Sequence, residues 1–217
     1  MEIIEVFPWN ENFETDIPEI DEQHKELVKL LNLLASNLAQ QADTAVLDEV
    51  FNKMAEYASY HFATEEAIWR QFFKEDSWEI DHQEDHRNFV EELLRLKAEG
   101  NKSSLVEVAE HTLSFLTHWL AFHILDNDKR MAKVVLAIKH SGLTVEEAKQ
   151  QSNHEMTGVA KILIDTILKM YDSLSNRTFQ LMCEVNERKQ TEIALENAKK
   201  MAVSANQAKS EFLANMS

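Results

Sequence analysis

HFATEEAIWRQFFKEDSWEIDHQEDH, residues 61–86, is the stretch that decides the fold. It contains two pairs of side chains spaced four residues apart, His61 with Glu65 and His82 with His86. Residues four apart lie on one face of an α-helix, so each pair can reach a common point. Two such pairs on successive helices predict a metal site inside a helical bundle.

Three further residues outside this stretch can complete the site: His24, His123 and Asp128. Imidazoles and carboxylates without a thiolate suit iron, zinc or manganese. The His123–Asp128 spacing of five residues is less regular, because it places the two side chains about 140° apart on an ideal helix. A local π-turn, or approach to the metal from two sides, would bring them together.

Two other interpretations compete with this one. A single histidine on a helix is more often a structural partner than a ligand, but burying five imidazoles and two carboxylates without a metal would cost several kcal/mol per unpaired group. A generic di-metal carboxylate bundle needs a Glu-x-x-His pair on each of two helices. Glu79 and His82 have that spacing, and no second pair accompanies them.

The rest of the chain predicts an all-α fold. It has only 3 Gly and 2 Pro in 217 residues, and this scarcity favours long helices. Apolar periodicity and capping residues predict helices over residues 17–40, 43–73, 76–99 and 103–140, with a short helix over 144–151. Short connections predict an antiparallel four-helix bundle. Pro8 and Trp9 suggest that residues 1–16 form an extended arm that packs on it.

From residue 156 onward the sequence predicts one long helix, whose length is typical of a coiled coil. Seven residues recur at alternating steps of three and four, which is a heptad pattern: Ile164, Ile167, Tyr171, Leu174, Thr178, Leu181 and Val185. A second pattern, offset by one position, follows the polar residues 186–189: Ala194, Ala198, Met201, Ala205, Ala208 and Phe212. A homodimer through this helix is expected.

Charge and composition narrow the function classes. The net charge of -16 disfavours nucleic acid and an anionic membrane surface as partners. Cys183 is the only cysteine, so one chain can hold neither a disulfide framework nor a Cys-based metal site. The N-terminus lacks the basic region of a signal peptide, and no apolar run is long enough to span a bilayer. A cytoplasmic location is expected.

Over about residues 1–140 the chain resembles the bacterial hemerythrins. The resemblance is carried by DEQHKEL (21–27), HFATEE (61–66), His82 with His86 and Phe89, and WLAFHI (119–124) with Asp128. It implies two non-haem iron ions with an oxo or hydroxo bridge. His82, His86 and His123 would bind one iron, His24 and His61 would bind the other, and Glu65 and Asp128 would bridge both.

The same resemblance implies one open coordination position, on the iron with two histidines, where dioxygen would bind. It places Trp119 and Leu120 near that position, where they would form an apolar wall, although both could equally be plain core residues. His111, His118, His140 and His154 match no ligand position and are expected at the surface or beside the ligands.

The last residues, KSEFLANMS (209–217), resemble the start of the dimerisation and phosphoacceptor helix of bacterial sensor histidine kinases. A generic parallel coiled coil is the alternative. No ATP-binding motif or Gly-rich phosphate loop is present, so this stretch of chain is not itself a kinase. We expect a bundle over 1–140, a connector over 141–157 and a signalling helix over 158–217 that leads into a kinase in the full-length protein.

Three functions are compatible with these features. The first is a dioxygen or redox sensor that controls a histidine kinase, and through it a response regulator, in two-component signalling. The second is an oxygen carrier or store, which would have little use for the long helix. The third is a di-iron enzyme acting on peroxide or nitric oxide, for which no acid–base residue stands out beyond the ligands.

Overall fold

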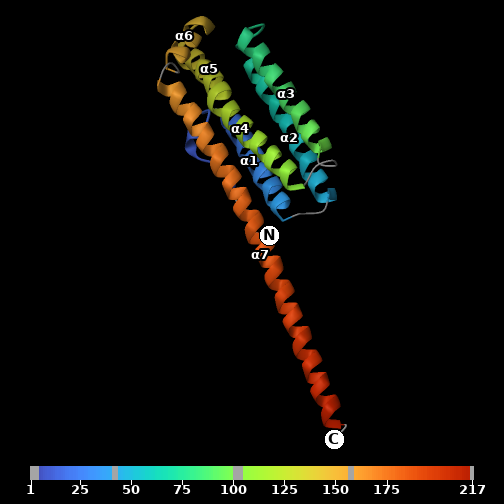
Figure 1. Ribbon diagram of the computed structural model, residues 1–217. Coiled ribbons are helices and arrows are strands. Elements are labelled where there is room, and N and C mark those ends of the chain that lie inside the picture. Colours follow the sequence, from blue (N-terminus) through green and yellow to red (C-terminus); the bar gives the residue numbers. More distant parts are fainter. Residues whose placement is uncertain (1–4, 41–43, 100–104, 156–158, 216–217) are drawn as a thin grey trace.

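The computed structural model describes residues 5–40, 44–99, 105–155 and 159–215, and every regular element in these ranges is a helix (Figure 1). Several predicted features lie outside the described residues: the cap at Asp43, the turn at Gly100 and Asn101, helix starts at Ser103, Ser104 and Met156, and the final Met216 and Ser217.

Four long helices form the bundle, and the all-α prediction is confirmed. They are α1 (Pro18–Ala39), α2 (Thr44–Trp69), α3 (Ser77–Glu99) and α4 (Leu105–Phe122). α4 continues through a six-residue π-helical segment, η2 (His123–Asp128), into α5 (Lys129–Ser141). α1 packs on α2 and α4, and α3 packs on α2 and α4, so that the four helices surround one axis (Figure 1).

Local sequence explains where these helices begin and end. Pro18 opens α1, where its missing N–H is not needed. The Asp76 side chain accepts a hydrogen bond of 2.8 Å from the Trp78 N–H and caps α3, as its sequence predicts. Gly142, with φ of 65°, ends α5 in the left-handed conformation. Thr144 and Glu147 then form a capping box that opens α6 (Val145–Glu155).

The N-terminal arm is part of the core, as predicted. Phe7 is fully buried, and its N–H and C=O both bond the Asn32 side chain of α1 at 2.9 Å. A short 3-10 helix, η1 (Glu11–Phe13), brings Phe13 into the same apolar cluster. The arm therefore fills the gap between the bundle and the long helix that follows it.

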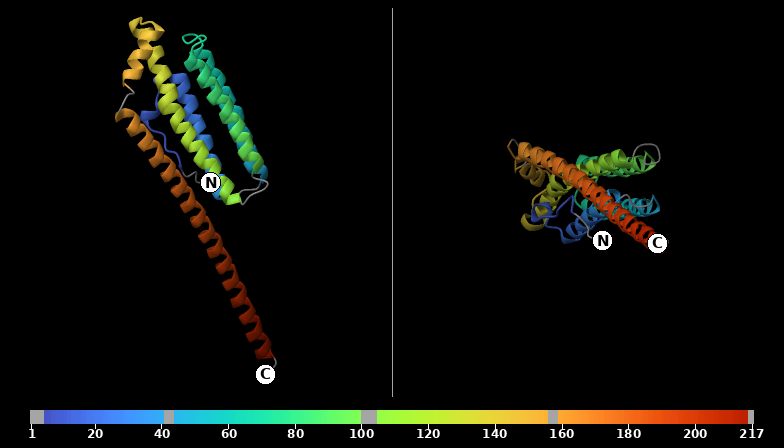
Figure 2. Two further views of the ribbon diagram at one scale, coloured as in Figure 1. Left: turned by 45° about the horizontal axis from the view of Figure 1, so that its top comes forward. Right: turned by 60° about the horizontal axis from the view of Figure 1, so that its bottom comes forward.

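The helix α7 (Val159–Asn215) runs along the bundle and then projects beyond it (Figures 1 and 2). Its first half contacts α1 and α4, and Ser175, Phe179 and Met182 are buried there. Residues 187–215 are exposed throughout. The heptad pattern did not anticipate the bundle contact, and the structure divides that pattern between two faces. Tyr171 turns toward the arm, whereas Leu174, Leu181 and Val185 remain exposed.

Two apolar clusters lie at successive levels of the bundle, and the polar residues of interest lie between them. Along α1, Ile20 belongs to one cluster and Leu27 to the other, with His24 between them. Among the described residues, none of the helices is long and apolar enough to cross a membrane.

Candidate metal centre

The seven candidate ligands predicted from the sequence converge on one buried layer of the bundle. α1 contributes one of them, α2 two, α3 two and the π-helical segment two. Each is at most 3% exposed: His24, His61, Glu65, His82, His86, His123 and Asp128. Every bundle helix therefore supplies side chains to the same enclosed space.

The potential ligand atoms form two overlapping groups. One comprises Glu65, His82, His86 and His123, and the other comprises His24, His61 and Glu65. Within each group the ligand atoms lie within 4.8 Å of one another. Such spacing suits two neighbouring cations that share Glu65.

Both carboxylates face both groups. Asp128 Oδ1 lies 2.9 Å from His82 Nε2, while its Oδ2 lies 3.2 Å from His24 Nε2. Glu65 Oε1 lies 3.5 Å from His24 Nε2, and its Oε2 lies 3.4 Å from His86 Nε2. Asp128 thus presents one oxygen to each side, and Glu65 also faces both sides, with its Oε2 in addition 3.5 Å from His61 Nε2. Both carboxylates are placed to bridge two metal ions.

The π-helical segment resolves the irregular His123–Asp128 spacing. A π-turn closes its hydrogen bond five residues along the chain instead of four, so side chains five apart share a face. As a result, Asp128 Oδ1 lies 3.3 Å from His123 Nε2. Of the two arrangements that the sequence left open, the structure has the π-turn.

The donor set fits metal ions better than it fits a metal-free core. Several fully buried polar atoms have no hydrogen-bond partner among the described residues, namely His24 Nδ1 and Nε2, His61 Nε2, both oxygens of Glu65, His123 Nδ1 and Asp128 Oδ2. Buried polar groups are nearly always paired, and each unpaired one costs roughly 1–3 kcal/mol. Their clustering in one layer is what a metal site requires.

Two partners of the candidate ligands were missed by the sequence analysis. Gln23 Oε1 accepts a hydrogen bond of 3.0 Å from His61 Nδ1, and this leaves His61 Nε2 free to face the centre. Glu66 Oε1 accepts one of 3.1 Å from His86 Nδ1. Such contacts fix the orientation of a ligating imidazole and raise its basicity. The only sign of these contacts in the sequence was that Gln23 stands next to His24 and Glu66 stands next to Glu65.

The local electrostatics favour deprotonated carboxylates. Burial raises the pKa of Glu65, but the surrounding histidines, His61 first, outweigh it and hold this pKa well below its usual range. Burial and the neighbouring Glu65 raise the pKa of Asp128, and the histidines lower it overall. Both side chains are therefore ready to bind cations.

The histidines divide into two classes. Burial lowers the pKa of His61 to about 3, and it also lowers that of His123. Burial opposes the charge on His24 and His86 as well, but their contacts with Asp128, Glu65 and Glu66 raise each pKa to about 9. Without metal, two imidazolium groups would thus balance the two carboxylates, and metal binding would displace their protons.

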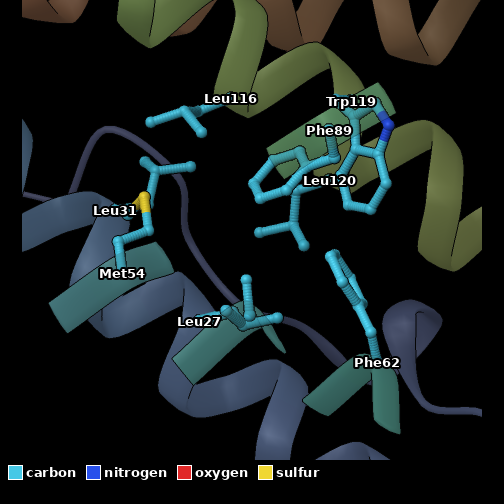
Figure 3. Close-up of a pocket in the computed structure, with 9 residues that line it drawn as sticks. Leu27, Leu31, Met54, Phe62, Phe89, Leu116, Trp119 and Leu120 are labelled. Carbon is cyan, nitrogen blue, oxygen red and sulfur yellow. The ribbon is translucent and has the colours of Figure 1, made fainter. Parts of the chain in front are cut away.

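An apolar pocket, whose lining residues are shown in Figure 3, adjoins the ligand layer. Its cavity volume is about 10 Å³, and its walls are entirely apolar. Four of its residues lie one helical turn from a candidate ligand on the same helix: Leu27, Ala58, Phe89 and Leu120. The resemblance to the bacterial hemerythrins implied that Trp119 and Leu120 lie near the open position, with plain core packing as the alternative. The Trp119 ring stacks on His123 at 4.2 Å, and Leu120 is buried in the pocket wall.

The other histidines whose side chains the structure describes are not part of this layer. His111, His118 and His140 are exposed, in keeping with the surface positions expected for them. The side chain of His154 lies outside the described part of the chain.

Comparison with known proteins assigns the family. The model of the hemerythrin HHE cation binding domain matches residues 15–135, more than half of the chain, so this chain belongs to the hemerythrin family. It contains a hemerythrin-like metal-binding domain of a family that binds dioxygen through non-haem iron.

Named relatives agree with that assignment. A bacteriohemerythrin of Pseudomonas paraeruginosa is 29% identical over 133 residues, which cover 61% of this chain and 82% of the relative. A myohemerythrin of Theromyzon tessulatum is 30% identical over 128 residues, covering 58% of this chain and 92% of the relative. The region matched by the family model, residues 15–135, ends before α7 begins.

Proposed function

We propose that the buried layer holds two non-haem iron ions. His82, His86 and His123 would hold one ion, His24 and His61 would hold the other, and Glu65 and Asp128 would be shared between them. The resemblance to the bacterial hemerythrins adds an oxo or hydroxo group as a further shared ligand. An iron pair held in this way can bind dioxygen and exchange electrons with it. The unpaired buried ligand atoms and the two-sided placement of both carboxylates support this ligand set.

The surrounding side chains would control what reaches the pair. We assign Trp119 and Leu120 to the wall of the dioxygen position, because both line the apolar pocket beside the ligand layer. An apolar wall excludes water and ions while admitting a small uncharged molecule. Gln23 and Glu66 would keep the His61 and His86 rings in place while the state of the centre changes.

We further propose that the domain is a dioxygen or redox sensor whose output passes through α7. The observation that carries this proposal is that α7 is built into the bundle, with Phe179 only 1% exposed. A carrier or store has no need for a 57-residue helix anchored in its core.

Packed rings connect the candidate ligand His24 with α7. The Trp9 ring centroid lies 6.4 Å from that of His24, Phe13 lies 5.6 Å from Trp9, and Tyr171 lies 5.6 Å from Phe13. The arm also bonds α7 directly, since Ser175 Oγ donates to Val6 O at 2.8 Å. A displacement of His24 would therefore press on α7 through the arm, in addition to any relay along α4, α5 and residues 141–157.

The output in this proposal is a histidine kinase that acts on a response regulator. The support is the resemblance of residues 209–217 to a kinase dimerisation helix, in a chain divided into a bundle (1–140), a connector (141–157) and a signalling helix (158–217). The projecting half of α7 would pair with that of a second copy. A cytoplasmic location remains a prediction from the sequence.

Hydrogen exchange tests the sensor role. We would compare backbone exchange over residues 171–186 in the iron-loaded protein, reduced under anaerobic conditions and after exposure to air. The proposal predicts a change of several-fold in this segment. Trp9→Ala should keep the iron but diminish the change. Identical exchange in the two states of the unsubstituted protein would refute the sensor role.

A further inference from the structure

The first half of α7 has a second apolar face that its own bundle does not cover. Among the described side chains, the bundle-facing side includes Tyr171, Ser175, Phe179, Met182 and Cys183. Around the helix from it lies what we call the α7 stripe, which consists of Ile167, Met170, Leu174, Leu181 and Val185. The exposed fractions of the stripe residues are 44, 66, 56, 56 and 63%.

The stripe is periodic and not a scatter of single apolar residues. Its members are separated by steps of three, four, seven and four residues, and Thr178 fills the seven-residue step. These steps keep all of them along one line of the helix surface, which is the pattern of a helix that packs on another helix. Isolated exposed apolar residues are common in proteins, whereas a continuous line of them marks an interface.

The two faces are far enough apart around α7 for the helix to contact its own bundle and a second helix at the same time. At about 100° per residue, the centre of the stripe lies roughly 110° around α7 from the centre of the bundle-facing side. A second helix can therefore lie along the stripe while the bundle keeps its hold on Phe179. In the half of α7 that runs along the bundle, the stripe residues are exposed.

We propose that the α7 stripe binds the same stripe of a second copy of this chain, in parallel and in register. Each α7 then lies between its own bundle and the α7 of its partner. The inference rests on the pairing of the projecting half proposed above and extends that interface onto the sensor domain itself.

A second copy is favoured as the occupant because the stripe leads directly into the projecting half of α7. Residues 187–215 are exposed in a single chain, and a lone helix in water is only marginally stable. The second heptad pattern, which includes Met201 and Phe212, lies in that half and presents an apolar seam of its own. One partner helix that winds around α7, with a local change of supercoil at the one-position offset, would cover both seams.

Charge placement agrees with a parallel pair. Glu184 and Lys189 flank the stripe at positions that meet across a parallel, in-register interface, Glu184 of one copy against Lys189 of the other. The arrangement also has a functional consequence. Because the same stretch of α7 contacts the bundle and the partner, a rotation of α7 at its bundle-facing side must alter the dimer interface.

Disulfide cross-linking in the iron-loaded protein tests the proposal. In a Cys183→Ser background, single cysteines would be placed at Leu181 in the stripe, at Ser173 as an exposed control away from both faces, and at Met201 in the projecting half. Equivalent seam positions in a parallel pair come within disulfide range, and we expect Leu181→Cys to cross-link at least about tenfold faster than Ser173→Cys.

The outcomes separate this proposal from the pairing of the projecting half. If Met201→Cys cross-links but Leu181→Cys cross-links no faster than Ser173→Cys, the stripe interface alone is overturned. Failure of both would overturn both, and cross-linking of Leu181→Cys alone would support the stripe without the projecting pair.

Charge substitution gives a second readout. Leu174→Glu places a charge in the stripe, and Ser173→Glu places the same charge one residue away. We expect Leu174→Glu to raise the dimer dissociation constant at least about tenfold above that of Ser173→Glu in sedimentation equilibrium. Iron content should be unchanged, because both side chains are exposed in a single chain. Equal dissociation constants for the two variants would contradict the proposal.

Discussion

Replacing Phe179 by alanine measures how firmly α7 belongs to the sensor bundle. The Phe179 side chain is 1% exposed and lies in the same apolar cluster as Phe7 and Phe13 of the arm. Truncating a fully buried phenylalanine removes its transfer free energy and leaves a cavity, which together cost about 3–5 kcal/mol. We therefore expect the free energy of unfolding to fall by about that amount.

Urea unfolding followed by circular dichroism is the assay, with protein concentration and iron content held equal between variants. Ser173→Ala is the matched control, because Ser173 is exposed on the same helix and its loss should change stability by no more than about 0.5 kcal/mol. A loss below about 1 kcal/mol for Phe179→Ala would refute the view that α7 is part of the core.

Three further predictions concern the metal centre. Asp128→Asn removes the charge of a carboxylate proposed to bridge the two ions and should lower iron content measured by metal analysis, whereas unchanged content would argue against that proposal. Glu66→Gln should reduce metal affinity about 10–100-fold in chelator competition by weakening the bond to His86, with equal affinity as the contrary result. In metal-free protein, His24 and His86 have pKa values raised to about 9, so their stabilisation is complete below pH 6.5 and is lost as pH rises through 9. His61, with its pKa lowered to about 3, costs stability as pH falls below 6.5. Urea unfolding across pH should therefore show a maximum near pH 6.5, and a maximum near pH 9 would contradict this assignment.

The ligand layer could be predicted because helix geometry alone brings its residues together. His61 with Glu65 and His82 with His86 share helix faces by their spacing, and the structure brings all four side chains into one buried layer. The five-residue spacing of His123 and Asp128 allowed either a local π-turn or approach to the metal from two sides. The sequence could not decide between them, because the local backbone hydrogen bonding depends on where the Asp128 side chain is held in the folded bundle.

The bundle-facing side of α7 could not be predicted. A heptad pattern shows that a helix has an apolar line, and it does not say which partner covers that line. Tyr171 belongs to the heptad pattern and yet packs on the arm, while Ser175 and Phe179 lie beside the pattern and are buried. The contacts of Gln23 and Glu66 with ligand histidines depend likewise on tertiary placement that no local pattern records.

The most direct test of the di-iron centre is a visible absorption spectrum with iron quantitation, on protein reduced under anaerobic conditions and then exposed to air. The account predicts iron bound at two sites in each chain and the appearance of ligand-to-iron charge-transfer bands after exposure to air. Protein that retains a single zinc ion and stays featureless in the visible range would contradict it, because the buried histidines and carboxylates would then form a structural site that dioxygen does not alter.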